Sequence, residues 1–305
     1  MYFSILKLMW ENQLQEIISG NYKSLARAIS LIENEFQGYE ELLKMLPSSD
    51  TPIIGITGPP GAGKSTIVDA LIEVIIGAHK KVGVICVDPS SPFNLGAILG
   101  DRIRMNEWYN HPGVYIRSLA TRGSLGGLHP KIIEVAELMK VAGFDYIIVE
   151  TVGVGQSEIE IAGLADVTAV VLVPEAGDEI QTMKAGLMEI ADIFVVNKGD
   201  RPDADLFIKN LKMILSPAIN GNRKEVPVLK TIASQKTGVD AFYQTIENLL
   251  SAAHENPKRD WLLAERAYFL IQKKRMQDID KKELLKGILE KGGDFNLYQF
   301  VSAFK

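Results

Sequence analysis

The segment IIGITGPPGAGKST, residues 53–66, joins an apolar run to a glycine-rich turn and a Lys-Ser pair. Residues 58–65 match the G-x-x-x-x-G-K-[ST] pattern of phosphate-binding loops. Glycines let backbone N–H groups wrap a phosphate, and the positive end of the following helix attracts its charge. Lys64 can reach the β- and γ-phosphates, while the Ser65 hydroxyl can ligate magnesium. The residues expected to bind the nucleotide here are Gly61, Ala62, Gly63, Lys64, Ser65 and Thr66.

Short apolar runs alternate with helical stretches along the chain. The runs are residues 53–57, 82–87, 114–117, 146–149, 167–173, 193–196 and 226–232. Helices are predicted at 65–79, 130–142, 180–191, 204–215 and 239–250. Nearly continuous apolar strands need both faces covered, which favours a parallel sheet between helices. The sequence therefore predicts an α/β fold, a P-loop NTPase with a mostly parallel central sheet.

Three segments are expected. Residues 50–256 are expected to form the P-loop domain. Residues 1–49 form an N-terminal helical extension, because Leu25, Ile29, Ile32 and Phe36 recur at helical spacing. Residues 257–305 are charged and helical in pattern, and they form a C-terminal arm.

Composition excludes several classes of protein. The 305 residues include 33 Lys and Arg against 38 Asp and Glu, and a net charge of −5 disfavours nucleic-acid binding. The single cysteine, Cys86, lies in an apolar run and allows no internal disulfide, which favours the cytoplasm. Apolar runs stay below the roughly 18 residues that cross a bilayer, so no membrane insertion is expected.

Carboxylates at the ends of predicted strands suit a magnesium site, because Mg²⁺ prefers hard oxygen ligands. Asp88 and Glu150 each follow an apolar run, and Asp101 opens the segment DRIR. With Ser65, these three are the candidate metal ligands. Glu150 also stands three residues before Gly153, as in the D-x-x-G switch of GTPases, and the Gly153 amide could sense a γ-phosphate.

The base is expected to be guanine. Residues 197–200, NKGD, follow the run at 193–196 and match the N-K-x-D guanine element. Asp200 can accept two hydrogen bonds from guanine that adenine cannot donate, and an unpaired buried carboxylate disfavours ATP. Asn197 would tie loops together, the Lys198 stem would cover the base, and Ala233 lies in the last candidate base loop.

Longer motifs narrow the class. They are VDPSSP at 87–92, GDRIRM at 100–105, TRGSLGG at 121–127, ETVGVGQSE at 150–158 and PEAGD at 174–178. Together they resemble the ArgK/MeaB family of GTPases over about residues 20–250. The resemblance implies a chaperone that loads and protects an adenosylcobalamin-dependent acyl-CoA mutase, typically methylmalonyl-CoA mutase. It also implies a homodimer held by the C-terminal arm, magnesium or switch roles for Asp88, Asp101 and Glu150, and a Lys184 that reaches the nucleotide.

Hydrolysis needs charge neutralisation and a group that orients the attacking water. Lys64 and magnesium supply the first, Glu150 is expected to hold that ion at the switch, and Gln156 is the amide next to the switch. The expected catalytic residues are therefore Lys64, Glu150, Gln156 and Lys184. Turnover is expected to be slow until a partner orders the switch. The alternatives are a nucleotide-dependent kinase or ATPase of a lysine/arginine/ornithine transport system, a nickel-inserting metallochaperone GTPase, and a non-hydrolysing nucleotide-binding module.

Overall fold

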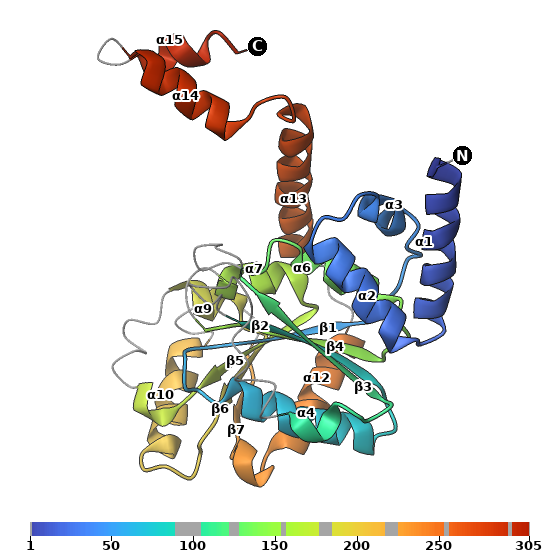
Figure 1. Ribbon diagram of the computed structural model, residues 1–305. Coiled ribbons are helices and arrows are strands. Elements are labelled where there is room, and N and C mark those ends of the chain that lie inside the picture. The colour runs from blue at the N-terminus through green and yellow to red at the C-terminus, as the bar shows by residue number, and fades with distance from the viewer. Residues whose placement is uncertain are drawn as a thin grey trace. The chain divides into compact units, whose positions relative to one another are not determined.

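The core of the computed structural model is a seven-stranded sheet in the order β3-β2-β4-β1-β5-β6-β7, and every neighbouring pair is parallel (Figure 1). The structure describes residues 2–88, 105–121, 128–153, 157–176, 185–216, 225–252, 256–291 and 295–304. The strands are β1 (Ile53–Thr57), β2 (Val82–Asp88), β3 (Val114–Ala120), β4 (Tyr146–Glu150), β5 (Val167–Leu172), β6 (Ile193–Val196) and β7 (Val228–Lys230). The predicted α/β fold is confirmed.

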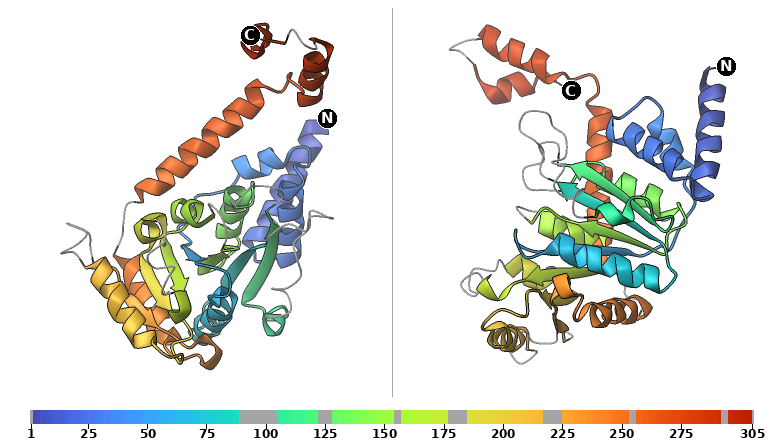
Figure 2. Two further views of the ribbon diagram at one scale, coloured as in Figure 1. Left: turned by 90° about the vertical axis from the view of Figure 1, so that its left-hand side faces the viewer. Right: turned by 60° about the horizontal axis from the view of Figure 1, so that its bottom comes forward.

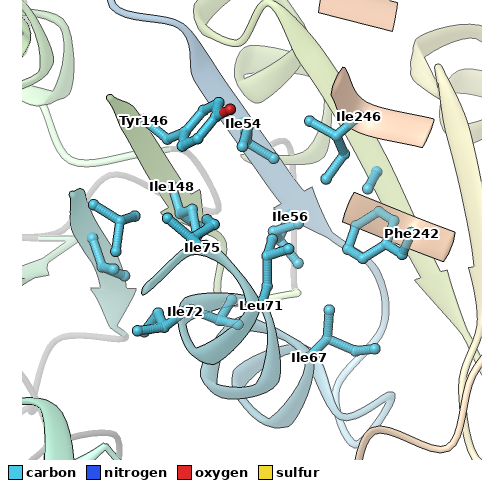
Figure 3. Packing of buried hydrophobic residues seen from close by; sticks show 14 of the residues in the cluster. Ile54, Ile56, Ile67, Leu71, Ile72, Ile75, Tyr146, Ile148, Phe242 and Ile246 are labelled. Carbon is cyan, nitrogen blue, oxygen red and sulfur yellow. The ribbon is translucent and has the colours of Figure 1, made fainter. Parts of the chain in front are cut away.

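Helices cover both faces of the sheet (Figures 1 and 2). On one face, α4 (Lys64–Gly77) and α12 (Val239–Ser251) pack on alternate strand residues, such as Ala169 and Val171 of β5. Figure 3 shows Ile67 and Leu71 of α4 against Ile56 of β1. On the other face, α7 (Ser157–Leu164), α9 (Ala185–Ile190) and α10 (Ala204–Leu215) pack on the intervening residues, including Val170 and Leu172. Burial on both faces explains why these strands read as continuous apolar runs.

The N-terminal extension is three helices, α1 (Tyr2–Ile18), α2 (Tyr22–Glu33) and α3 (Tyr39–Lys44). Helix α2 contacts α6 (Ile132–Lys140), and Glu33 pairs with Arg117 of β3. Leu25, Ile29 and Ile32 are buried as predicted, but Phe36 is 51% exposed. That part of the prediction is wrong because α2 ends at Glu33 and is capped by Asn34, so Phe36 lies beyond the helix.

Two compact units make up the chain, Met1–Arg259 and Asp260–Lys305. The second unit contains most of α13 (Pro257–Arg275), together with α14 (Lys281–Lys291) and α15 (Leu297–Val301). None of the helices in the described ranges combines the length and apolarity needed to span a bilayer. The domain boundaries at 49/50 and 256/257 remain predictions.

Asn256 caps the start of α13, within the first unit. Its Oδ1 accepts from the N–H groups of Lys258 and Arg259 at 3.1 and 3.3 Å, which caps α13, and Pro257 suits the first helical position. Its Nδ2 donates to the carbonyls of Ala162 and Ala165, at 3.2 and 2.9 Å, at the end of α7. One side chain of the first unit thus joins the first turn of α13 to the end of α7, the helix that follows the predicted switch.

Candidate nucleotide-binding site

The glycine-rich turn links β1 to α4, which begins at Lys64. Gly58, Gly61 and Gly63 have φ of +139°, +76° and +87°, a region that other residues rarely adopt. A Cβ on Gly58 would lie 2.1 Å from the carbonyl oxygen of Val171. Glycine is therefore required there for steric as well as conformational reasons. The strand, turn and helix follow one another as the phosphate-binding pattern predicts.

Lys64 is buried, and its ammonium group lies within the turn itself. Nζ donates to the carbonyls of Gly58 and Pro59 at 2.9 and 3.1 Å. Gly153, the predicted phosphate sensor, lies directly against this group, because a Cβ added there would come within 2.5 Å of both Lys64 Nζ and the Gly58 oxygen. The structure thus brings the segment after β4 to the lysine of the phosphate loop.

Two of the three predicted metal carboxylates lie at this edge of the sheet. Ser65 Oγ donates to Glu150 Oε1 at 2.7 Å. Asp88 is buried at the end of β2, and β2 pairs directly with β4, where Cys86 is opposite Glu150. A hydroxyl and two carboxylates are hard oxygen donors, so the residues present suit Mg²⁺. Asp101 lies outside the described residues, and within the described ranges no three His, Cys, Asp or Glu side chains are grouped so that they could hold a metal ion.

A cavity of about 420 Å³ lies between these groups. Its walls come from the turn and first residues of α4, from the ends of β2 and β4, and from Lys198. Thr66, another predicted nucleotide ligand, also lines it. A larger cavity of about 620 Å³ lies beside residues that precede strands, such as Pro52 and Asp166, and so at the opposite end of the sheet. Only the smaller one contains the phosphate-binding turn.

The candidate base loop is connected to the phosphate loop by Asn197. Its buried side chain donates from Nδ2 to the carbonyl of Ala62 at 3.0 Å, and its Oδ1 accepts from the N–H of Ala233 at 3.1 Å. Lys198 Nζ donates to the carbonyl of Gly61 at 2.8 Å. Asp200 is exposed at the end of this loop. Three segments far apart in the sequence therefore meet around one residue.

Some candidates are not placed, and some contacts were not anticipated. Gln156 and Lys184, like Asp101, fall outside the described residues. Sequence reasoning missed Thr231, whose Oγ1 donates to Asn197 Oδ1 at 3.3 Å. It also missed the Thr57–Thr151 pair described below. Thr57 and Thr231 lie within predicted strands and Thr151 lies within the ETVGVGQSE motif, and a hydroxyl residue in such a segment is the signal that could have found them.

Comparison with known proteins identifies the family. A family model described as methylmalonyl-CoA mutase-associated GTPase MeaB matches residues 25–287. A Pyrococcus horikoshii protein, provisionally named a GTPase, is 40% identical over 292 residues, which is 94% of this chain and 89% of the relative. GTPase ArgK of Escherichia coli is 36% identical over 250 residues, covering 78% of this chain and 75% of ArgK.

A solved structure has a similar fold. The crystal structure of an LAO/AO transport system kinase superimposes with a TM-score of 0.67 and 26% identity, covering 93% of this chain and 87% of the other. The family match spans the phosphate loop, the base loop and both neighbouring carboxylates. This chain therefore belongs to the MeaB family and is a P-loop GTPase.

Proposed function

We propose that this GTPase is a G-protein chaperone that gates cofactor loading and protection of an adenosylcobalamin-dependent acyl-CoA mutase, methylmalonyl-CoA mutase. The observation that most directly supports this proposal is the match of residues 25–287 to a family described by its association with that enzyme. The site supports a switching role. The switch segment begins at Glu150, which accepts a hydrogen bond from Ser65, and ends at Gly153, which lies against the ammonium group of Lys64. A nucleotide bound in this cavity would contact both ends of that segment.

The residues have distinct proposed roles. Residues 61–66 hold the phosphates of GTP or GDP, and Lys64 neutralises the charge that develops on hydrolysis. Ser65, Asp88, Asp101 and Glu150 hold Mg²⁺, which when bound adds charge neutralisation to the phosphates. Asp200 selects guanine and Lys198 covers the base. The N–H of Ala233 already donates to Asn197, so this residue acts by holding the base loop in place.

Stimulation by the mutase tests the proposal. Gln156, three residues after Gly153, is proposed to orient the attacking water, and Lys184, in the segment that follows the PEAGD motif, is proposed to reach the nucleotide. A partner that holds Gln156 and Lys184 at the nucleotide would supply this positioning, so we expect methylmalonyl-CoA mutase to raise the rate of GTP hydrolysis at least about tenfold. The measurement is phosphate release with and without a molar excess of mutase. Equal rates would refute regulation of turnover by this partner.

Retention of the mutase on immobilised protein gives a second readout. GTP-loaded and GDP-loaded chains should retain different amounts, because the nucleotide state changes the segment between Glu150 and Gly153. A Lys64→Ala chain, which cannot respond to the γ-phosphate, is the matched control and should retain the same amount with either nucleotide. Equal retention by the wild-type chain in both states would contradict nucleotide-gated binding.

We also propose that the chain is a homodimer held by its C-terminal arm. Within the second unit, large side chains are strongly exposed, with Trp261 at 64%, Tyr268 at 68%, Leu289 at 71% and Tyr298 at 85%. So much exposed apolar surface on one short segment is typical of a surface that a partner covers. A second copy of this arm would present the same surface.

Sedimentation velocity tests the dimer. The wild-type chain should sediment as a dimer at micromolar concentration, and Tyr268→Glu should shift it toward the monomer by placing a charge in the apolar contact. Lys274→Glu, on the same helix at an exposed position, is the control and should leave the dimer intact. A wild-type chain that sediments as a monomer would refute the proposal.

A kinase or ATPase of an amino-acid transport system is the second candidate, because the superimposed crystal structure is that of an LAO/AO transport system kinase. That function requires a protein phosphoacceptor and transfer of label from the γ-phosphate. Labelled GTP whose phosphate appears only in solution would exclude it.

A further inference from the structure

Two buried threonines form a hydroxyl pair beside the nucleotide site. Thr57 is the last residue of β1 and directly precedes Gly58, while Thr151 directly follows Glu150. Their Oγ1 atoms are 2.9 Å apart, and the residues are 0% and 2% exposed. The N–H of Thr151 also donates to the carbonyl of Ile56 at 3.0 Å, which extends the pairing of β1 and β4 by one rung. The pair therefore joins the entry to the phosphate loop with the start of the switch.

The hydroxyl pair and the Ser65–Glu150 hydrogen bond lie on opposite faces of the sheet. Ile56 and Glu150 are opposite each other in the β1–β4 register, Ile56 packs in the core with α4, and Glu150 accepts from Ser65 of α4. Thr57 follows Ile56 and Thr151 follows Glu150. Because successive side chains of a strand point to opposite faces, the two threonines face away from α4. Their face is that of Gly55, where a Cβ would meet Ile161 of α7 at 2.7 Å. The end of β4 is thus held from both sides.

We propose that Thr57 and Thr151 are positioning residues for GTP hydrolysis. By holding the chain just after Glu150, the pair sets where the Glu150 carboxylate stands relative to Ser65 and where Gly153 meets Lys64. Displacements of about 1 Å in a catalytic arrangement can cost about 100-fold in rate. The inference rests on the proposed roles of Glu150 at the metal and Gly153 at the γ-phosphate, and it adds the residues that hold both in place.

The binding of GDP separates a positioning role from a general structural one. GDP is held by the phosphate loop and the base loop, whereas the switch segment is needed for the γ-phosphate and the metal. Loss of the pair should therefore affect hydrolysis and magnesium dependence while leaving GDP affinity nearly unchanged. A merely structural role would lower the affinity for GDP and GTP together.

The test compares Thr151→Val with Thr151→Ser. Valine has the shape of threonine without the hydroxyl, so we expect kcat to fall about tenfold and the Mg²⁺ concentration for half-maximal hydrolysis to rise several-fold. GDP affinity should stay within about twofold, and serine, which keeps the hydroxyl, should restore most of the rate. Thr57→Val should reproduce the Thr151→Val phenotype, and the double variant should be no worse than either single variant, because both changes remove the same hydrogen bond.

Failure of this inference can be told apart from failure of the proposed function. All of these rates are intrinsic and need no mutase. If Glu150→Gln disturbs the magnesium dependence but Thr151→Val does not, only the positioning role is overturned. If Glu150→Gln leaves the magnesium dependence unchanged, the metal role fails and the inference falls with it. Equal losses of GDP and GTP affinity in Thr151→Val would reduce the pair to a structural contact and would also overturn the inference.

Discussion

Lys64→Ala should reduce GTP hydrolysis by about 100- to 1,000-fold, because it removes the cation that neutralises charge developing on the transferred phosphate. The ammonium group lies inside the turn, where it donates hydrogen bonds to the carbonyls of Gly58 and Pro59 and lies next to Gly153. No other described lysine occupies this position. The measurement is single-turnover phosphate release with saturating GTP and magnesium. Affinity for GTP should fall with the rate.

Two controls make this result interpretable. Lys44→Ala removes an exposed lysine on α3 and should leave the rate unchanged. Thermal unfolding in the absence of nucleotide shows whether the Lys64→Ala chain is folded. A folded variant that hydrolyses GTP at more than about a tenth of the wild-type rate would contradict the role of Lys64 in charge neutralisation.

Asp200→Asn should weaken GTP binding by about 100-fold, since hydrogen bonds to a charged group contribute about 1.5–3 kcal/mol and each 1.4 kcal/mol is tenfold in affinity. The carboxylate is proposed to accept from N1–H and the exocyclic amine of guanine. An asparagine amide presents a donor in place of one acceptor, so affinity for xanthosine triphosphate, whose ring has an oxygen in place of that amine, should rise. Competition of each nucleotide against a fluorescent GDP analogue measures both changes.

The matched control for this variant is Asp203→Asn. Asp203 is an exposed aspartate three residues further along, at the start of α10, with φ of +64°, a conformation that asparagine also tolerates. It should change nucleotide affinity less than about twofold. If Asp200→Asn leaves the ratio of GTP to ATP affinity unchanged, guanine is selected elsewhere in the site.

Much of this architecture follows from short stretches of sequence. Residues 204–215 were predicted as a helix and form α10, and the apolar runs at 53–57 and 193–196 are β1 and β6. The phosphate loop is equally local, because glycines, Lys64 and Ser65 carry their chemistry within one turn of chain. Side-chain periodicity and turn chemistry are properties of neighbouring residues, so a pattern is sufficient to locate them.

The boundaries of several helices and strands could not be read from the sequence pattern alone. The helical extension expected over residues 1–49 is broken at Gly20 and Gly38, whose φ are +86° and +87°. Helix α7 went unpredicted because its eight residues show no clear apolar stripe. The run at 226–232 contributes only Val228–Lys230 to the sheet, because pairing with β6, itself a four-residue strand, sets its extent.

Long-range contacts were decided only by the folded chain. Asn197 bonds to Ala62 across 135 positions, and Thr57 bonds to Thr151 across 94. No spacing rule relates such pairs, because strand order and register bring them together and both depend on the free energy of the whole packed sheet. Residue types thus fix the available chemistry in this GTPase, while the parallel sheet determines which groups act together.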